Sequence, residues 1–273
     1  MAPVRIHHLN CGTLRPPGES MVCHVLLLET DSRLVLVDTG LGTADVREPR
    51  RLGPVRHVIK AALREEETAI AQIRSLGLDP ADVGDIVLTH GDLDHAGGIG
   101  DFPDAQVHLS ADEHVALNRR RGLLESQRYR PAQWAHRPRI TGHPPGEGTW
   151  MGFERVVDLS EVTAGMLLVP LAGHTAGHAG VAVPTAGGWL LHAGDAFHSP
   201  DSLEQGRNRP DVHVRQGVLA HDGRALRRTQ RALSALAGRK DLQIINSHDR
   251  GSWEASRVDR AARAGSRRPE DGS

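Results

Sequence analysis

The feature that most constrains this chain is a dense group of metal-ligand side chains in the segment THGDLDHAGGIG. Two histidines and two aspartates lie within six residues, namely His90, Asp92, Asp94 and His95. Glycines at 97, 98 and 100 follow and allow the backbone to fold closely around these side chains. Because a catalytic metal site needs several nitrogen and oxygen ligands on rigid elements, the segment predicts a metal-binding loop. The alternative is an aspartate-rich turn that caps the following helix.

Three later apolar segments also have a histidine or an aspartate at or shortly after their C-terminal end. MLLVPL precedes His174, WLLHAGD ends on Asp195, and LQIINSHD contains His248. A single histidine at a strand end is commonly a core or surface residue. Four such segments in one chain are difficult to explain independently, because α/β proteins place functional groups where strands end and loops begin. We therefore expect these side chains to converge on one site.

Apolar spacing along the rest of the chain predicts strands that alternate loosely with helices. A hairpin is expected from HVLLLET and RLVLVDTG, which are separated by the polar DSR. Helical spacing predicts helices over 65–76, 111–120 and 224–238. Further strands are expected over 105–110 and 180–184, in addition to those that carry the candidate ligands.

We expect one domain over residues 1–253. Within it, residues 119–160 are rich in Arg, Pro, Gly and Trp and show no clean period, which predicts a loop-rich insertion over one face. Residues 254–273 contain little that could be buried and predict a polar, disordered tail.

Composition argues against several partners. A formal net charge of −1 in 273 residues provides no basic field for nucleic acid or an anionic membrane. The chain has no apolar run near the roughly 20 residues that cross a bilayer, and its N-terminal segment lacks a signal-peptide core. We expect a cytoplasmic protein with a small-molecule substrate and with Cys11 and Cys23 reduced and buried. The seventeen histidines, against one tyrosine, favour metal chemistry, although we expect most of them at the surface.

The order of these motifs resembles that of the metallo-β-lactamase-fold hydrolases. The similar motifs are H-x-D-x-D-H at 90–95, G-H-T-x-G-H at 173–178, the later G-D and S-H, and the upstream LVLVDTG, which together cover about residues 20 to 250. The resemblance implies an α/β protein with an αββα sandwich, in which two mixed β-sheets lie face to face with helices outside. It also implies a dinuclear metal centre at one edge, and the layout most resembles the acyl-homoserine lactonase and glyoxalase II branches.

Carried over position by position, the resemblance implies seven metal ligands. His90, Asp92 and His174 would hold one divalent ion, Asp94, His95 and His248 would hold the other, and Asp195 would bridge the two. Asp38 and His178 would bind no metal; Asp38 would orient a ligand or the loop by hydrogen bonding, and His178 would hydrogen-bond across its loop.

Asp92 departs from the commoner motif, which has histidine at this position. Two divalent ions carry +4 and the three aspartates carry −3, so the centre is left at +1, and a bridging hydroxide makes it neutral. Such a centre should be a weaker Lewis acid than its histidine counterpart. Zinc is the first expectation, and the carboxylate makes iron or manganese possible. On this count Asp92→His should retain zinc better. The alternative is that Asp92 does not ligate and the first site is empty or weak.

The activity that the resemblance implies is hydrolysis of a lactone or thioester by a hydroxide held at the dinuclear centre, with Asp94 accepting or relaying the proton. Lactonases have a tyrosine three residues after the bridging aspartate. His198 stands there in this chain and could polarise the substrate carbonyl or simply face solvent. Four residues of the segment 119–160 are candidates for lining a substrate pocket: Tyr129, Arg130, Trp134 and His136. The alternative is that the loop packs on itself.

Two other classes of function stay open. The first is a β-lactam or phosphodiester hydrolase of the same fold, and the second is a non-hydrolytic diiron or binding protein. Flavodiiron proteins of this fold place a carboxylate at the position of Asp92, but they carry a flavodoxin domain for which this chain has no room. The complete set of seven ligand candidates favours an enzyme over a binding protein.

Overall fold

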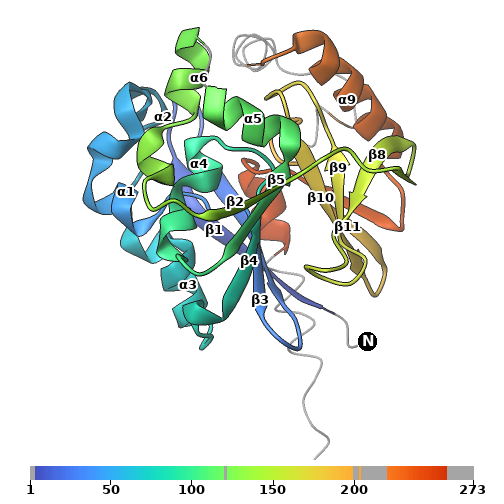
Figure 1. Ribbon diagram of the computed structural model, residues 1–273, viewed down its shortest axis with the longest axis horizontal. Helices are drawn as coiled ribbons and strands as arrows, with labels where there is room; N and C mark the ends of the chain where they lie inside the picture. The colour runs from blue at the N-terminus through green and yellow to red at the C-terminus, as the bar shows by residue number, and fades with distance from the viewer. Residues whose placement is uncertain (1–3, 120–121, 199–202, 204–219, 257–273) are drawn as a thin grey trace, which may run out of the picture.

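Two six-stranded β-sheets lie face to face, and helices cover the outer side of each sheet (Figure 1). This arrangement comes from a computed structural model that describes residues 4–119, 122–198, 203 and 220–256. It confirms the expected αββα sandwich of two mixed sheets.

The first sheet is built by the N-terminal half of the chain. Its strands, in spatial order, are β1 (Arg5–Leu14), β2 (Met21–Glu29), β3 (Leu34–Val37), β4 (Val83–Val87), β5 (Gln106–Ser110) and β6 (Arg139–His143). The pairs from β1 to β3 are antiparallel, whereas those from β3 to β6 are parallel. The expected hairpin corresponds to β2 and β3. Because β3 and β4 run in the same direction, the loops that follow them meet at one edge of the sheet.

The second sheet is built by the C-terminal half. Its strands, in spatial order, are β12 (Leu242–Ile245), β11 (Gly188–His192), β10 (Ala179–Thr185), β9 (Leu167–Pro170), β8 (Phe153–Asp158) and β7 (Gly148–Trp150). All pairs are antiparallel except β11 with β12. This one parallel pair brings the ends of β11 and β12 to the same edge, where Asp195 and His248 follow.

The helices are mostly short. The α-helices are α1 (Thr43–Arg47), α2 (Arg56–Ile59), α3 (Ala69–Ser75), α4 (Leu93–Ala96), α5 (Ala111–Arg119), α6 (Gly122–Arg128) and α9 (Gly223–Leu236). Short 3₁₀ segments are formed by Pro49–Val55, which is interrupted at Gly53, and by Glu65–Glu67, Pro80–Asp82, Gly97–Asp101 and Pro131–Trp134. The predicted helices 65–76 and 224–238 correspond to the turn at Glu65–Glu67 with α3, and to α9.

Three apolar layers hold the four structural layers together. The layer between the sheets joins side chains of β2, β3 and β4 to side chains of β9, β10, β11 and β12, for example Leu28 and Val37 with Val181 and Ile245. A second layer packs α3 and α5 on the first sheet, and a third packs α9 on the second sheet. Because these strands are buried on both faces, their sequences are continuous apolar runs rather than alternating patterns.

The segment 119–160 differs from the prediction. It is not a loop-rich insertion, because it contains α6, a 3₁₀ turn and the strands β6, β7 and β8. β6 completes the first sheet, and β7 with β8 begins the second, so the segment is the connection between the two sheets. Its strands were missed because they are short and contain glycine or charged residues at exposed positions.

The C-terminal prediction can be compared with the structure only in part. Residues 250–256 are helical, so the predicted tail does not begin at Glu254. The rest of that prediction, residues 257–273, lies outside the described residues. Cys11 and Cys23 are both buried and free. Among the described residues, no helix has the length and apolar character needed to cross a bilayer.

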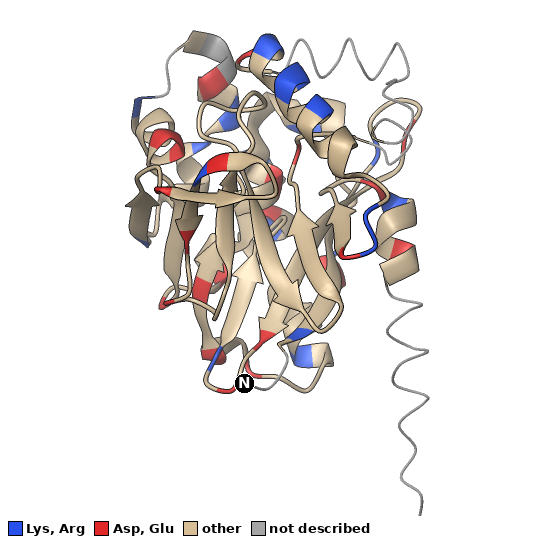
Figure 2. Ribbon diagram, turned by 90° about the vertical axis from the view of Figure 1, so that its right-hand side faces the viewer, with Lys and Arg blue, Asp and Glu red and all other residues tan. Residues whose placement is uncertain are grey.

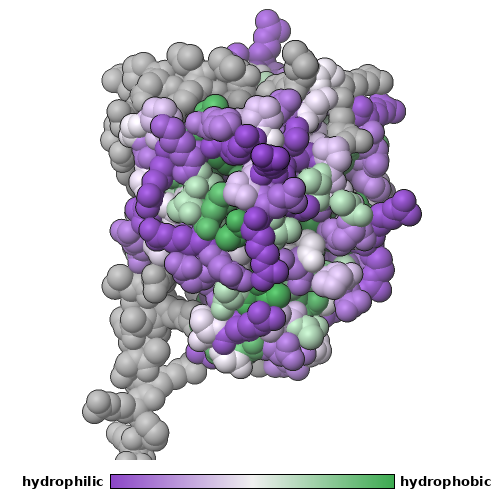
Figure 3. Space-filling view, turned by 90° about the vertical axis from the view of Figure 1, so that its left-hand side faces the viewer, coloured by the Kyte–Doolittle hydropathy of each residue, from purple (hydrophilic) through white to green (hydrophobic). Residues whose placement is uncertain are grey.

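The outer surface is polar. The exposed face of α9 carries Arg224, Arg227, Arg228 and Arg231, which contribute to the basic residues in Figure 2. Its opposite face buries Leu233 against the second sheet and Leu226 beside Gly173 in the loop after β9. On the side of α1 and α2, hydrophilic side chains surround a few hydrophobic ones (Figure 3). The two exposed large hydrophobic side chains among the described residues are Val58 and Val115.

The central apolar layer gives a stability prediction. Leu28 lies between the sheets and is 0% exposed, so Leu28→Ala should lower the free energy of unfolding by about 3 kcal/mol through lost burial and the remaining cavity. The control Val58→Ala, at a residue 60% exposed, should change it by less than about 0.5 kcal/mol. Urea unfolding at one fixed zinc concentration measures both. Equal midpoints for the two variants would contradict the packing between the sheets.

Candidate metal centre

The seven candidate ligands come from both sheets and meet at one edge of the sandwich. The loop after β4 and the short helix α4 carry four of them: His90, Asp92, Asp94 and His95. The loops after β9, β11 and β12 carry the other three: His174, Asp195 and His248. The structure therefore brings together every residue that the sequence predicted as a ligand. Their roles as ligands remain a proposal.

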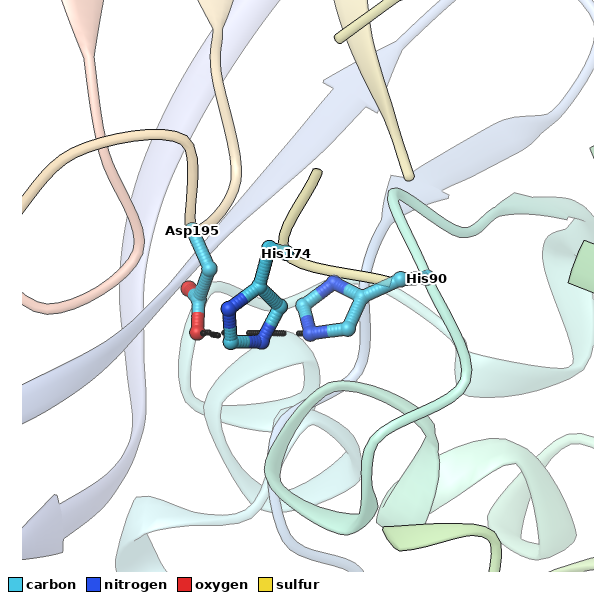
Figure 4. Close-up of side chains that lie close together, drawn as sticks. All are labelled: His90, His174 and Asp195. Carbon is cyan, nitrogen blue, oxygen red and sulfur yellow. Dashed lines mark ion pairs between the residues drawn. The ribbon is translucent and has the colours of Figure 1, made fainter. Parts of the chain in front are cut away.

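The first group surrounds the carboxylate of Asp92. Asp92 Oδ2 lies 3.4 Å from His90 Nε2 and 3.2 Å from His174 Nε2. Asp195 Oδ2 lies 3.5 Å from His174 Nε2 and 4.0 Å from His90 Nε2. Figure 4 shows both imidazoles and the Asp195 carboxylate directed toward one another. Asp92 is the N-cap residue directly before α4, but its side chain makes no capping hydrogen bond, so the helix-cap alternative does not describe this residue.

The second group lies on the other side of Asp195. Asp195 Oδ1 is 3.4 Å from His95 Nε2 and 3.2 Å from His248 Nε2. His248 Nε2 is also 3.6 Å from Asp94 Oδ2. His248 Nε2 is also 3.3 Å from Asp195 Oδ2, so it lies near both oxygens. The carboxylate of Asp195 thus lies between the two groups and contacts imidazoles of both, which is the position that a bridging ligand would occupy.

The atoms of the centre fit divalent cations. His90 Nε2, His95 Nε2, Asp92 Oδ1 and Asp195 Oδ1 are buried without a hydrogen-bond partner among the described residues. Buried polar atoms are normally hydrogen-bonded, so four unpaired atoms at one place indicate a missing partner. Ligand atoms of His90, His174 and Asp195 lie within 4.8 Å of one another, as do those of Asp94, His95 and His248. Imidazole nitrogens and carboxylate oxygens are the ligand types that divalent metal sites use, so these groups are candidate metal sites.

Hydrogen bonds orient two of the candidate ligand histidines. His95 Nδ1 donates to Asp38 Oδ2 at 2.9 Å, and His248 Nδ1 donates to the carbonyl of Val22 at 2.9 Å. Asp38 also accepts the backbone N–H and the hydroxyl of Thr89, each at 2.8 Å. With Nδ1 occupied in this way, Nε2 of each ring is directed at the centre.

His178 holds the backbone of the central aspartate. Its Nδ1 donates to the carbonyl of Leu171 at 3.0 Å, so its Nε2 can accept the N–H of Asp195 at 3.0 Å. Gly194 precedes that aspartate with φ +54°, and a Cβ there would lie 2.5 Å from His178 Nε2. Only glycine therefore permits this contact.

Glu113 on α5 connects the two ligand loops and was not identified from the sequence. It is 0% exposed and accepts four hydrogen bonds. Oε1 accepts from Gly91 N–H at 2.9 Å and Tyr129 Oη at 3.0 Å, and Oε2 from Thr175 Oγ1 at 2.6 Å and Gly177 N–H at 3.0 Å. Gly91 belongs to the loop after β4, and Thr175 and Gly177 to the loop after β9. These donors lie in segments of the chain far from Glu113 in the sequence, so no local sequence pattern could have identified its role.

Arg128 was also missed, and it changes the charge of the centre. Its Nη1 lies 3.2 Å from Asp92 Oδ2, and its side chain is only 7% exposed. Although burial alone would raise it, the pKa of Asp92 is held well below its usual range by Arg128 and His90. The charge count made from the sequence did not include this buried guanidinium, which lies in contact with the aspartate.

The ligands are strongly coupled electrostatically. Burial would raise the pKa of Asp195, but His248 and His95 hold it well below its usual range. Burial lowers the pKa of His248, yet Asp195 more than offsets this and raises it to about 9. The pKa of His95 also lies well above its ordinary value, because Asp195 and Asp38 outweigh burial. In the metal-free protein, these imidazolium protons supply the positive charge that a cation would otherwise provide.

The remaining candidate residues lie in different environments. The ring of His198 is 5.8 Å from that of His248, so it borders the centre. Tyr129 is 1% exposed and packs in the core of the first sheet, so its assignment to a substrate pocket is wrong. Trp134 packs partly buried against the same core. Arg130 lies against Gly53, and His136 is exposed beside Gly100.

The histidine excess has a second source besides the centre. Ten of the seventeen histidines are buried, so the expectation that most lie at the surface is wrong. Several of them hydrogen-bond within the sheets. His108 on β5, for example, binds Asp85 at 2.9 Å through Nε2 and His143 at 3.0 Å through Nδ1.

Comparison with known proteins is consistent with this geometry. The sequence profile of the metallo-beta-lactamase superfamily matches residues 20–257. A probable metallo-hydrolase of Mycobacterium tuberculosis is 44% identical over 259 residues, which are 93% of this chain and 83% of that protein. An N-acyl homoserine lactonase of Azorhizobium caulinodans is 29% identical over 227 residues, 80% of this chain and 78% of that protein. A solved N-acyl homoserine lactone hydrolase, with the product N-hexanoyl-L-homoserine at its catalytic metal centre, has a TM-score of 0.68 at 20% identity, covering 93% of this chain and 97% of that one.

Zinc uptake should release protons at pH 7. With a pKa of about 9 in the metal-free protein, His248 carries a proton that it must lose to bind a cation. Apparent zinc affinity should therefore rise about tenfold per pH unit for each displaced proton as pH increases from 7 toward 9. Titration with a pH indicator in weakly buffered solution measures the release.

The free energy of unfolding of the metal-free protein should fall as pH rises from 7 toward 9, the range over which zinc affinity rises. A raised histidine pKa stabilises the fold fully below the ordinary value of 6.5, and this stabilisation is lost as pH rises through about 9. Zinc uptake at pH 7 without proton release would contradict the pairing of His248 with Asp195.

Glu113→Gln should weaken zinc binding from outside the ligand set. The glutamine amide nitrogen cannot accept two of the four donors, so the ligand loops lose part of their connection. We expect zinc affinity to fall by about 10- to 100-fold and the free energy of unfolding to fall by about 2 kcal/mol or more. The exposed Glu154→Gln on β8 is the control. Equal zinc affinity in the two variants would show that Glu113 does not support the centre.

Proposed function

Because the chain belongs to the metallo-beta-lactamase superfamily of hydrolases, we propose that it opens an ester-type bond at a centre of two zinc ions. The substrate we propose is a lactone of the N-acyl homoserine type, with a thioester as the related alternative. The observation that carries the proposal is the position of Asp195, whose carboxylate lies between the two candidate ligand groups and contacts imidazoles of both. Relatives named N-acyl homoserine lactonases, at 25–29% identity, support the choice of a lactone.

The donor set favours zinc. Four imidazoles and three carboxylates provide borderline nitrogen ligands together with harder oxygens, which suit zinc and leave iron or manganese possible. When bound, two such cations lower the pKa of water and polarise a carbonyl, which is the chemistry that ester hydrolysis needs.

The carboxylates differ in their access to solvent, and this difference assigns their roles. The side chains of Asp94 and Asp92 are 17% and 15% exposed, whereas that of Asp195 is 7% exposed. A substrate therefore approaches on the side of Asp92 and Asp94. Asp94 Oδ2 is the group we assign to accept the proton of the attacking water and pass it to the leaving alkoxide.

His198 is assigned to the substrate carbonyl. Its ring borders that of His248, where a ring N–H could donate to the developing oxyanion. The other ligand side chains are 0–7% exposed, so little of the centre is accessible to a substrate. This restriction suits a small molecule rather than a polymer.

Zinc-loaded protein should hydrolyse N-acyl homoserine lactones. Within a panel that also contains thioesters, a β-lactam and a phosphodiester, we expect the highest kcat/KM for a lactone. Asp195→Ala should lower activity more than about 100-fold with loss of zinc, because one carboxylate serves both ions. His198→Phe should lower kcat by about 100-fold and leave the zinc content unchanged.

Two results would contradict the proposal. One is turnover of the β-lactam or the phosphodiester without turnover of any lactone or thioester. The other is hydrolysis that persists after zinc has been removed and that Asp195→Ala does not reduce. Either would assign the centre to a different reaction.

A further inference from the structure

Arg128 lies on α6 and contacts both loops that carry the first ligand group, the loop of Asp92 and the loop of His174. It is the last residue of α6, and its Nη1 lies 3.2 Å from Asp92 Oδ2. The same nitrogen donates to the backbone carbonyl of His174 at 3.2 Å. The guanidinium thus joins the aspartate of one ligand loop to the backbone of the other.

Burying the charged guanidinium of Arg128 costs free energy unless an opposite charge lies against it. The Arg128 side chain is 7% exposed, and an arginine stays charged at any working pH. A buried charge requires an opposite charge in good geometry, because removing one partner leaves the other uncompensated. Asp92 is a carboxylate in contact with the Arg128 guanidinium. Loss of the Asp92 charge would therefore remove a compensating charge from the buried Arg128, and loss of Arg128 would remove one from Asp92.

The charge count gives the reason for the pair. Two divalent ions (+4) with Asp92, Asp94 and Asp195 (−3) leave +1, and Arg128 (+1) brings the total to +2. A centre with a neutral histidine at position 92 and no arginine has +4 and −2, which also leaves +2. The aspartate and the arginine together therefore carry the same charge as one histidine.

We propose that Arg128 is a positioning residue that holds Asp92 as a ligand and makes the Asp92–Arg128 pair the electrostatic equivalent of the usual histidine. The inference rests on the proposed dinuclear centre. It reverses the expectation drawn from the sequence for Asp92→His. That variant alone leaves a buried guanidinium beside two cations at a total charge of +3, so it should bind zinc less well.

The test is a double-variant cycle on zinc affinity. Metal-free wild type, Asp92→His, Arg128→Met and the double variant are titrated with zinc against a chelating indicator. We expect Asp92→His to weaken binding of the less tightly held zinc by about tenfold or more. In the double variant, affinity should return to within about threefold of wild type. A purely structural role for Arg128 would not produce this rescue, because the second substitution removes a further native contact.

Controls separate the pair from general charge effects. Arg227→Met removes an exposed arginine of α9, so combining it with Asp92→His should give additive losses and no rescue. Arg128→Lys keeps the charge without the planar guanidinium and should retain zinc better than Arg128→Met if geometry contributes as well as charge.

The outcomes distinguish this inference from the proposed function. If wild type binds no zinc, the metal centre itself is wrong. If wild type binds two zinc ions and the cycle is additive, or the double variant fails to fold or to bind zinc, only the role of Arg128 is overturned. If wild type binds one zinc ion and Arg128→Met binds two, the guanidinium occupies the place of the first metal, and the inference is likewise overturned.

Discussion

The contact of Asp195 with imidazoles from both sheets is the interaction on which the rest of the site depends. His90 and His95 belong to the first sheet, whereas His174, His248 and Asp195 itself belong to the second. The distance between the two sets is determined by the apolar layer between the sheets. The packing of the core therefore also determines the geometry of the centre, because a shift of one sheet relative to the other would separate the candidate ligands of the two sheets.

Around this contact, buried polar groups act as fixed supports. Asp38 orients His95, His178 holds the backbone of Asp195, and Glu113 connects the loops after β4 and β9. Each of these side chains is buried, with an exposed fraction of 0% to 1%. In such surroundings a hydrogen bond is worth more and an unpaired group costs more than in water. The support is therefore rigid only while every member keeps its partner.

The Asp92–Arg128 contact shows how a departure from a family motif can leave the charge of a site unchanged. An aspartate in place of histidine is, by itself, a change of one charge next to two cations. A guanidinium 3.2 Å away removes that change and also ties α6 to the loop of His174. Motif comparison at one position is therefore incomplete when a residue elsewhere in the chain compensates for it.

The sequence by itself determined the set of candidate ligands, and through the family resemblance that their motifs carry it implied the sandwich. These features leave local signals, because strands buried on both faces are continuous apolar runs, and each candidate ligand follows such a run or lies in the loop between β4 and the glycines that follow His95. Strands β1 and β6 to β8 lacked this signal, since histidines, glycines or charged residues interrupt them. Only the tertiary structure decided that Glu113 and Arg128 support the centre and that Tyr129 belongs to the core. The physical reason is that these roles depend on contacts between segments far apart in the chain, which no local spacing encodes.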